Sequence, residues 1–325
     1  MSDRLEPILA ELKRAESVLI SSHIAPDPDA VGSSCGLALG LRALGIPAEV
    51  YLHDGVPRRM LGLTEAIDVY SSELPEEKFS VVVAIDCATK RRLGPHHDAL
   101  FALAPVTINI DHHVSNERYG KMNYIDSKTA SASELTLRIL RALECPMTPE
   151  IATLLYAGVL DDTGSFRFGN VTAETLRNAA DLVSAGAVVE TISNQLYYEV
   201  PIRMFRLRAL TLAEMRPALQ GRLSLAVITQ GMLDTAGATA EDTDGIVDEL
   251  RMLEGSICAV LIRQLEKGWK VSLRAKDASV DMNRVAGMFG GGGHRAAAGC
   301  TLQGAIEDVE RQIVEAVGTE FSGLS

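Results

Sequence analysis

The sequence has 325 residues, of which 47% are hydrophobic and 23% are charged. This composition is typical of a globular protein, and the length is sufficient for two domains. The formal net charge of −12 argues against the strongly basic surface with which proteins grip long nucleic acid. We therefore expect any nucleic-acid partner to be short and held at a local site, with no long duplex bound.

No apolar run approaches the roughly 18–20 residues that a membrane-spanning helix needs. The first residues also lack the charged-then-apolar order of a secretory signal, so we expect a cytoplasmic protein that does not associate with membranes. Five scattered cysteines without a C-x-x-C pair argue against a disulfide framework and a thiolate zinc site. We interpret them as small buried hydrophobic residues: Cys35, Cys87, Cys145, Cys258 and Cys300.

The first half of the chain alternates predicted strands and helices. Residues 80–87 form a nearly all-apolar run, which is typical of a parallel strand buried on both faces. The other predicted elements of this half are strands over 17–23, 48–53 and 106–111, a helix over 29–44, and mostly helical chain over 130–198. Strands that alternate with helices indicate an α/β domain with an open, mostly parallel sheet.

The pattern changes after a helical connector that is broken near Pro201. Beyond it the sequence predicts strands over 223–229, 258–265 and 270–274, the last two joined as a hairpin, and helices over 281–289 and 305–317. We therefore predict an N-terminal catalytic domain over 1–190, a helical linker over 191–212, and a smaller α+β domain over 213–325.

The first group of candidate site residues follows the first predicted strand. Pro28 favours an extended Asp27, and residues two apart in extended chain point the same way, so Asp27 and Asp29 can converge. With His23 they suit a divalent cation that accepts oxygen and nitrogen ligands. The alternative is an ordinary loop with an aspartate that caps the next helix.

Two more predicted strands end in acidic residues or histidines. Asp86 ends the apolar strand, and Asp111, His112 and His113 follow the next one, where open α/β sheets place their ligands. For Asp86 alone, a turn aspartate is an equally good interpretation. Adjacent histidines in extended chain face opposite ways, so both reach one site only if the chain turns there. One could then bind metal and the other substrate.

A second histidine pair, His96-His97, follows Gly-Pro rather than a strand. We expect it in a solvent-exposed loop.

The segment 160–167 contains an aspartate doublet, and the sequence physics does not decide whether Asp161 or Asp162 points inward. Gly164 ends the helical run, and Arg167 could pair with a phosphate.

Four consecutive glycines, residues 290–293, precede His294 near the C-terminus. Glycines expose backbone N–H groups and allow positive φ, so a phosphate or base could approach closely. A helix that began just beyond His294 would further favour an anion. The alternative is a flexible hinge.

Five of these carboxylates can meet on one rim: Asp27, Asp29, Asp86, Asp111 and Asp162. Clustered without a counter-charge, they would raise each other's pKa and destabilise the fold. Two divalent cations would offset four of the charges, and ions about 3.5–4 Å apart clamp the attacking and leaving oxygens of a phosphoryl displacement. Carboxylate and imidazole ligands favour Mn²⁺, with Mg²⁺ or Co²⁺ as alternatives.

These blocks, in this order, resemble the DHH phosphoesterase family, of which Asp111-His112-His113 is the namesake motif. The resemblance covers nearly the whole chain, and the glycine-rich block resembles the DHH-associated C-terminal domain of one branch. The most similar branch is the compact bacterial oligoribonucleases, or nano-RNases, which also dephosphorylate 3′-phosphoadenosine 5′-phosphate (pAp).

The resemblance implies a role for each site residue. His23 and Asp27 would bind one metal, and Asp29, His112 and Asp162 the other, with Asp86 bridging both. Asp111 would orient a histidine, and His113 would contact the scissile phosphate. The C-terminal domain would close over the substrate with these residues: Arg274, Gly291, Gly292, Gly293 and His294.

The implied reaction is hydrolysis of short oligoribonucleotides to nucleoside monophosphates, and of pAp to AMP, by a hydroxide activated by two metals that attacks phosphorus in line. The resemblance also implies a homodimer. A cyclic dinucleotide or linear dinucleotide phosphodiesterase stays open as an alternative, and a nucleotide-binding regulator with a decayed site is a remote one. A pyrophosphatase is disfavoured by the glycine-rich domain, and a processive exonuclease by the short, acidic chain.

Overall fold

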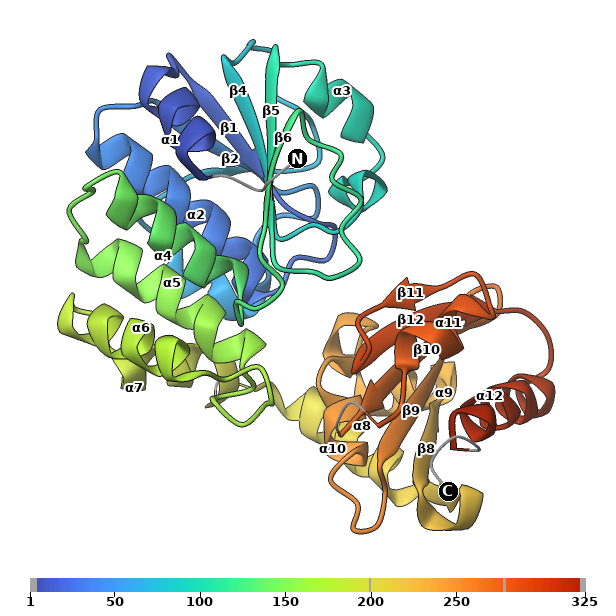
Figure 1. Cartoon of the computed structure of the whole chain (residues 1–325). Coiled ribbons are helices and arrows are strands. Elements are labelled where there is room, and N and C mark those ends of the chain that lie inside the picture. Colours follow the sequence, from blue (N-terminus) through green and yellow to red (C-terminus); the bar gives the residue numbers. More distant parts are fainter. Residues whose placement is uncertain (1–4, 199, 277–278, 322–325) are drawn as a thin grey trace. The chain divides into compact units, whose positions relative to one another are not determined.

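The computed structural model describes residues 5–198, 200–276 and 279–321. The chain divides into two compact units, Met1–Glu199 and Val200–Ser325 (Figure 1). Each unit has its own six-stranded sheet and its own hydrophobic core. Within the described ranges, no helix combines the length and the apolar character needed to cross a bilayer.

The first sheet is entirely parallel, with the strand order β3-β2-β1-β4-β5-β6. Every residue of β4 is buried, as the apolar run predicts, because helices or turns cover both faces. The predicted open parallel sheet is therefore confirmed, with two short strands, β3 and β6, that the sequence did not predict. The strands are β1 (Val18–Ser21), β2 (Ala48–Tyr51), β3 (Val69–Tyr70), β4 (Val81–Ile85), β5 (Val106–Asp111) and β6 (Met122–Ile125).

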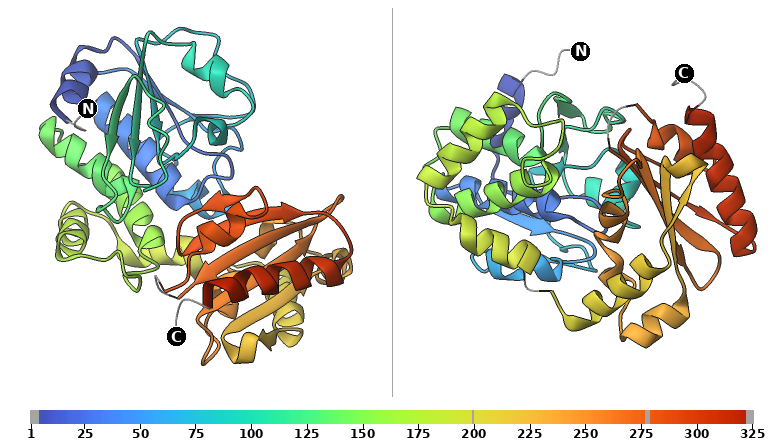
Figure 2. Two further views of the ribbon diagram at one scale, coloured as in Figure 1. Left: turned by 45° about the vertical axis from the view of Figure 1, so that its right-hand side comes forward. Right: turned by 90° about the horizontal axis from the view of Figure 1, so that it is seen from below.

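Most helices of this unit gather on one face of the sheet, where they bury the larger core (Figure 2). The other face is covered by α3 and the 3₁₀ turn η2 over a smaller apolar cluster. The helices are α1 (Leu5–Arg14), α2 (Pro28–Ala43), α3 (His97–Phe101), α4 (Ala132–Ala142), α5 (Pro149–Asp162), α6 (Ala173–Ser184) and α7 (Val189–Ser193); the turns are η1 (Arg58–Leu63), η2 (Lys90–Leu93) and the π-helical η3 (Asn194–Tyr198).

The exposed loop predicted at the second histidine pair is only half right. His96 is exposed, whereas His97 begins α3, and its Nδ1 lies 2.8 Å from the Gly94 carbonyl oxygen. The Gly-Pro sequence therefore introduces a short helix here rather than a loop.

Glycines let α2 and α5 approach closely beneath the candidate site. A Cβ on Gly32 would lie 2.3 Å from the Leu154 carbonyl oxygen. A Cβ on Gly158 would lie 2.0 Å from the Ser133 hydroxyl and 2.5 Å from the Asp29 carboxylate. Any side chain at either position would push the helices apart.

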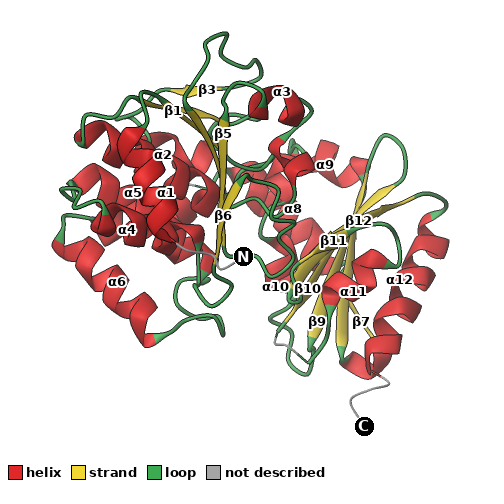
Figure 3. Ribbon diagram, turned by 45° about the horizontal axis from the view of Figure 1, so that its top comes forward, coloured by secondary structure: helices red, strands yellow, loops and turns green. Residues whose placement is uncertain are grey.

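The second sheet is mixed, with the order β11-β12-β10-β9-β8-β7 and one parallel pair, β8 with β9. Helices α11 and α12 cover one face over one apolar core (Figure 3), and α8, α9 and α10 bury a second cluster on the other. The strands are β7 (Arg216–Ala218), β8 (Leu223–Ile228), β9 (Cys258–Gln264), β10 (Trp269–Ala275), β11 (Gly292–Gly293) and β12 (Ala297–Leu302).

The predicted β9–β10 hairpin and the two C-terminal helices are present. Pro201 directly precedes α8, where the sequence predicts a break in the helical connector. The helices of this unit are α8 (Ile202–Ala213), α9 (Gln230–Ala236), α10 (Ile246–Leu250), α11 (Met282–Gly287) and α12 (Ile306–Phe321), and its 3₁₀ turns are η4 (Leu219–Gly221) and η5 (Glu241–Thr243).

The chain does not begin a helix just beyond His294, so the helix dipole considered for this segment is not present. The backbone N–H of His294 donates to the Ala297 carbonyl in a tight turn, and the chain continues as β12. The glycines have a packing role in this β11–β12 hairpin, because a Cβ on Gly291 or Gly293 would lie 2.2 Å or 2.5 Å from a backbone oxygen. Gly293 also adopts a φ of +148°, which side chains rarely allow.

The cysteines behave as small apolar residues. All five are free, four are buried, and Cys145 is partly buried.

Candidate active site

The chain leaves β1 into a loop that brings His23 and Asp27 together. Asp27 is the N-cap of α2, and its Oδ1 accepts a hydrogen bond from the Ala30 N–H at 2.9 Å. Its Oδ2 lies 3.6 Å from His23 Nε2. Because His23 Nδ1 is 2.8 Å from the Ile24 carbonyl, a proton on Nδ1 leaves the Nε2 lone pair facing the carboxylates.

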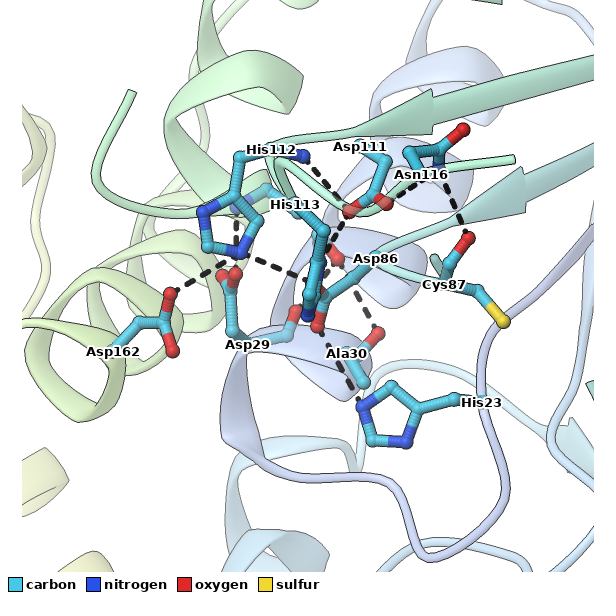
Figure 4. A network of polar contacts seen from close by, with 12 residues as sticks. His23, Asp29, Ala30, Asp86, Cys87, Asp111, His112, His113, Asn116 and Asp162 are labelled. Atoms are coloured by element: carbon cyan, nitrogen blue, oxygen red, sulfur yellow. Dashed lines mark hydrogen bonds and ion pairs between the residues drawn. The ribbon is translucent and has the colours of Figure 1, made fainter. Parts of the chain in front are cut away.

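Asp86 lies at the centre of the site, directly after β4. It is only 2% exposed and adopts a left-handed φ of +52°, which few residues other than glycine, asparagine and aspartate tolerate. Its Oδ2 is 3.8 Å from His23 Nε2, and its Oδ1 is 3.3 Å from His112 Nε2. The two oxygens of one carboxylate thus face two different histidines (Figure 4).

The chain turns immediately after β5, so both adjacent histidines reach this carboxylate. His113 Nδ1 lies 3.7 Å from Asp86 Oδ1, and the His112 and His113 rings are 4.8 Å apart. His113 Nδ1 also donates to Asp111 Oδ1 at 2.7 Å. Asp111 is fully buried and accepts a further hydrogen bond from the Asn116 amide at 2.5 Å. It therefore fixes the ring of His113 from behind.

Asp29 is the second residue of α2 and faces the start of α4. Its Oδ2 accepts the Ala132 N–H at 2.6 Å, and its Oδ1 accepts the Ser133 N–H at 2.9 Å. These two backbone N–H groups at a helix N-terminus favour a negative charge and fix the orientation of the carboxylate. They also leave each oxygen with a lone pair for another partner.

The structure separates the two aspartates at the end of α5. Asp162 Oδ2 lies 3.3 Å from His112 Nε2, so it belongs to the cluster. Asp161 instead pairs with Arg59, with Oδ1 3.2 Å from Nη1. Consecutive helical residues point about 100° apart, so only one of the two can face the cluster.

The six candidate ligands form two groups: Asp86 belongs to the first, and its Oδ1 lies 3.3 Å from His112 of the second. The donor atoms of His23, Asp27 and Asp86 lie within 4.8 Å of one another, as do those of Asp29, His112 and Asp162. The structure thus brings together all six residues that the family resemblance assigns to metal, from the loop after β1, the start of α2, the chain just beyond β4 and β5, and the end of α5.

The electrostatics of the cluster fit divalent cations. Burial, reinforced by the charge of Asp86, raises the pKa of Asp29 to about 8. Burial likewise raises the pKa of Asp162 well above its ordinary value, although His112 opposes the shift. Burial disfavours the charged form of His112, but Asp162 and Asp86 more than offset it and raise the pKa of His112 well above its usual range. Without a cation, the cluster takes up protons to relieve its own repulsion.

One buried atom tests most clearly whether these residues fit a metal ion. Asp86 Oδ1 has no hydrogen-bond partner among the described residues, although it is enclosed by ring nitrogens. A buried carboxylate oxygen without a partner is costly, and a cation between the facing donor atoms would satisfy it. The donor set, oxygen and imidazole nitrogen without thiolate, suits Mn²⁺, Mg²⁺ or Co²⁺. The residues present therefore fit a metal centre.

The predicted substrate-binding arginines lie in different units. Arg167 is exposed on the loop after α5, where its Nε donates to the Gly164 carbonyl at 2.6 Å. Arg274 is partly buried on β10, where its Nη1 donates to the Leu273 carbonyl at 3.1 Å and its Nε lies 3.8 Å from Asp248. His294 and the glycines form the β11–β12 hairpin described above.

Sequence reasoning missed several residues that support the site. Asn116 holds Asp111, and the Arg92 guanidinium lies 3.2 Å from His23 Nδ1. Ser131 is the N-cap of α4, the helix whose first N–H groups donate hydrogen bonds to Asp29. Only Ser131 carried a usable signal, because a serine before a helical pattern marks an N-terminus.

Two family profiles match the chain, one in each unit. The DHH family, N-terminal domain, matches residues 17–159, and the DHHA1 domain matches residues 224–323. The first match contains every residue of the cluster except Asp162.

Relatives cover almost the whole chain. The bifunctional oligoribonuclease and PAP phosphatase NrnA of Thermus thermophilus is 34% identical, over 98% of this chain and 95% of its own length. The protein of the same name from Bacillus subtilis is 28% identical, over 88% of this chain and 90% of its own. An exopolyphosphatase-related protein from Bacteroides fragilis shares the fold, with a TM-score of 0.91 at 23% identity over 98% of this chain and 96% of that one. The chain therefore belongs to the DHH family of phosphoesterases.

Proposed function

We propose that this enzyme hydrolyses short oligoribonucleotides to nucleoside monophosphates and pAp to AMP, in a reaction that depends on two divalent metal ions. The observation that carries the proposal is the position of Asp86, one carboxylate facing two histidine–carboxylate groups. The substrates are inferred from relatives named for oligoribonuclease and PAP phosphatase activity.

Each metal would have its own set of ligands. His23 and Asp27 would hold one ion, and Asp29, His112 and Asp162 the other, with Asp86 shared. We propose Mn²⁺ for both because the ligands are carboxylate and imidazole. When bound, the ions would lower the pKa of the attacking water and neutralise charge on the phosphoryl oxygens.

The residues of the chain would orient the reaction. Asp111 holds the Nδ1–H of His113, so the Nε2 edge of that ring would contact the scissile phosphate and stabilise its developing charge. The hydrogen bonds from the start of α4 fix Asp29, which limits the freedom of the second ligand group. Asp86, held by its left-handed backbone, would keep the two groups at a fixed separation.

In the second unit, we propose that Arg274, His294 and the hairpin glycines contact the nucleotide. Gly292 is exposed on β11, where a ligand could approach the backbone closely, and an arginine on β10 suits a phosphate. Arg167 in the first unit would add a further phosphate contact. We also propose that the enzyme works in the cytoplasm as a homodimer, which light scattering of the purified protein would check.

A substrate panel tests the proposal. The Mn²⁺-loaded enzyme should release AMP from a 5′-phosphorylated diadenylate (pApA) and from pAp faster than it opens cyclic di-AMP. Faster hydrolysis of cyclic di-AMP would replace the proposal with a cyclic dinucleotide phosphodiesterase. Nucleotide binding without any hydrolysis would instead indicate a regulator.

A further inference from the structure

Asn116 lies just beyond the two adjacent histidines, and its side-chain amide contacts two parts of the first unit. Its Nδ2 donates to Asp111 Oδ2 at 2.5 Å and to the Cys87 carbonyl oxygen at 3.3 Å (Figure 4). Its Oδ1 accepts the backbone N–H of Arg118 at 2.7 Å. One amide therefore bridges the end of β5 and the chain beyond β4, which are far apart in the sequence.

These three contacts require an amide at this position. The two acceptors, a carboxylate oxygen and a carbonyl oxygen, need N–H donors, whereas the Arg118 N–H needs an acceptor. An amide supplies both, so the contacts also determine which end of the Asn116 side chain is nitrogen. An ionised aspartate of the same shape would offer no donor and would repel Asp111. The position therefore depends on hydrogen bonds and not on size alone.

The contact with Asp111 acts on the ring of His113. Asp111 is fully buried, and its Oδ1 accepts hydrogen bonds from His113 Nδ1 at 2.7 Å and from the His112 N–H at 2.8 Å. Its Oδ2 accepts the bond from Asn116. A carboxylate held at both oxygens cannot rotate without breaking a charge-assisted hydrogen bond. Asn116 therefore fixes the direction in which His113 presents its ring.

The contact with Cys87 ties the same support to the turn at Asp86. The Cys87 carbonyl also accepts a hydrogen bond from Tyr119 Oη at 2.8 Å, so two side chains from the loop after β5 hold the residue that follows Asp86. Asp86 itself has the left-handed φ of +52°. Such a conformation persists where surrounding contacts determine it. The loop that carries His113 is thus fastened to the turn that presents Asp86.

We infer that Asn116 is a positioning residue that orients His113 toward the phosphate that is hydrolysed. The inference rests on the proposed function and deepens it, because one amide would set the phosphate contact relative to Asp86. Within the described chain, no side-chain hydrogen bond of Asn116 involves one of the six candidate metal ligands. Asn116 should therefore affect the geometry of the reaction, in which a misplacement of about 1 Å can cost about a hundredfold in rate.

A double-mutant cycle with His113 tests this role. The substrate is bis(p-nitrophenyl) phosphate, a chromogenic phosphodiester that needs no nucleotide recognition. With Mn²⁺ bound, N116A should lower kcat about tenfold or more and leave KM unchanged, as expected for a contact made in the transition state. In an H113A background, N116A should lower kcat by less than about threefold, because the group that Asn116 positions is gone. Equal losses in both backgrounds would overturn the inference.

Two further variants complete the kinetic test. N116D keeps the shape but removes both donors, so kcat should fall at least as far as in N116A, and wild-type kcat in N116D would contradict the inference. N123A is the matched control, because Asn123 also holds a turn beyond β5, through hydrogen bonds with Gly120. N123A should keep the wild-type kcat. A loss equal to that in N116A would reduce the effect to general support of the loop and refute the specific role.

A spectroscopic experiment separates this inference from the proposed function, because it requires no turnover. In Mg²⁺-loaded protein labelled with ¹⁵N-histidine, the His113 Nδ1–H that donates to buried Asp111 should give a resonance that exchanges slowly with water and is absent from H113A. The resonance should persist in N123A and weaken through faster exchange in N116A. An unchanged resonance in N116A would contradict the inference, even if the enzyme hydrolyses the proposed substrates.

The number of bound manganese ions distinguishes the positioning of His113 from support of the metal centre. N116A, reloaded with Mn²⁺ and desalted, should contain as many ions as the wild type by elemental analysis, because the contacts of Asn116 lie outside the candidate metal ligands. Fewer ions would assign Asn116 to the metal centre and overturn the inference. This measurement does not depend on which nucleotide the enzyme prefers.

Discussion

The two units bring charged side chains together in different ways. In the first unit, carboxylates and histidines follow β1, β4 and β5, whose carboxyl ends meet on one rim because the strands are parallel. In the second, the cations Arg263 and Lys270 meet on a strand face because β9 and β10 pair in one particular register. The first arrangement can be anticipated from where each strand ends, whereas the second depends on the exact register of the predicted hairpin, which the sequence does not show.

The largest effect should come from the residue shared by both ligand groups. The Asp86→Asn variant keeps the side-chain shape and a residue that tolerates the left-handed φ, so the fold should persist. It removes the charge facing both histidines, and kcat should fall by about a thousandfold or more, as for loss of a central electrostatic group. Steady-state hydrolysis of pApA in excess Mn²⁺ measures this. Activity within tenfold of wild type would contradict the shared role.

The aspartate doublet gives a sharper contrast within one helix end. Asp162→Asn should lower kcat by about a hundredfold, because it removes a carboxylate 3.3 Å from His112. Asp161→Asn weakens its partly exposed ion pair with Arg59, and such a pair is typically worth about 1 kcal/mol or less. The same assay on both variants checks this. Equal losses would place both carboxylates at the reaction centre.

The stability of the metal-free protein should depend on pH because the carboxylate–histidine cluster of the first unit binds protons. The pKa of Asp29 is raised to about 8, whereas an unfolded aspartate titrates near about 4. Between these values the folded state binds more protons, so its free energy of unfolding falls as the pH rises. The raised pKa of His112 acts in the same direction. As the pH rises above the ordinary pKa of histidine, it lowers the free energy of unfolding further.

Divalent cations bind the deprotonated cluster, so they should oppose the fall in the free energy of unfolding as the pH rises. Melting temperatures measured at pH 5, 6.5 and 8, with EDTA or with Mn²⁺, test the linkage. The stabilisation by Mn²⁺ should grow with pH. A gain that is constant across the three values would show that the cluster does not exchange protons for metal.

The smallest effect concerns packing beneath the first site. Gly158→Ala places a Cβ 2.0 Å from the Ser133 hydroxyl and should destabilise the protein by about 1–3 kcal/mol. Gly287→Ala in α11 is the control, because nothing lies within 4 Å of its Cβ. That substitution should be neutral or stabilising by up to about 1 kcal/mol. Thermal unfolding of both variants measures the difference, and identical behaviour would refute the close approach of α5 to α4 and α2.

Much of the first unit could be predicted because its signals are local. The apolar run at β4 and the acidic residues after it sit where a buried strand must end. Strands β3 and β6 could not be predicted in this way, since they are short and only partly buried. The left-handed Asp86 and the hydrogen bond from Asn116 to Asp111 depend on tertiary contacts that leave no sequence pattern.

The second unit shows where local reasoning fails. Residues 297–299, Ala-Ala-Gly, have little intrinsic strand preference, yet they form β12 because they pair with β10 and β11. The glycine run suggested a flexible loop or a phosphate loop, whereas its glycines are also required for the close packing of the hairpin. Arg263 and Lys270 had no visible link before their register was known.

The most direct test of the central claim is a count of bound manganese. Protein stripped with EDTA, reloaded with Mn²⁺ and desalted should contain two ions per chain by elemental analysis. The Asp162→Asn variant should retain about one, because its change affects only the second ligand group. One ion or none in the wild type, or two in the variant, would contradict a pair of metals held on either side of Asp86.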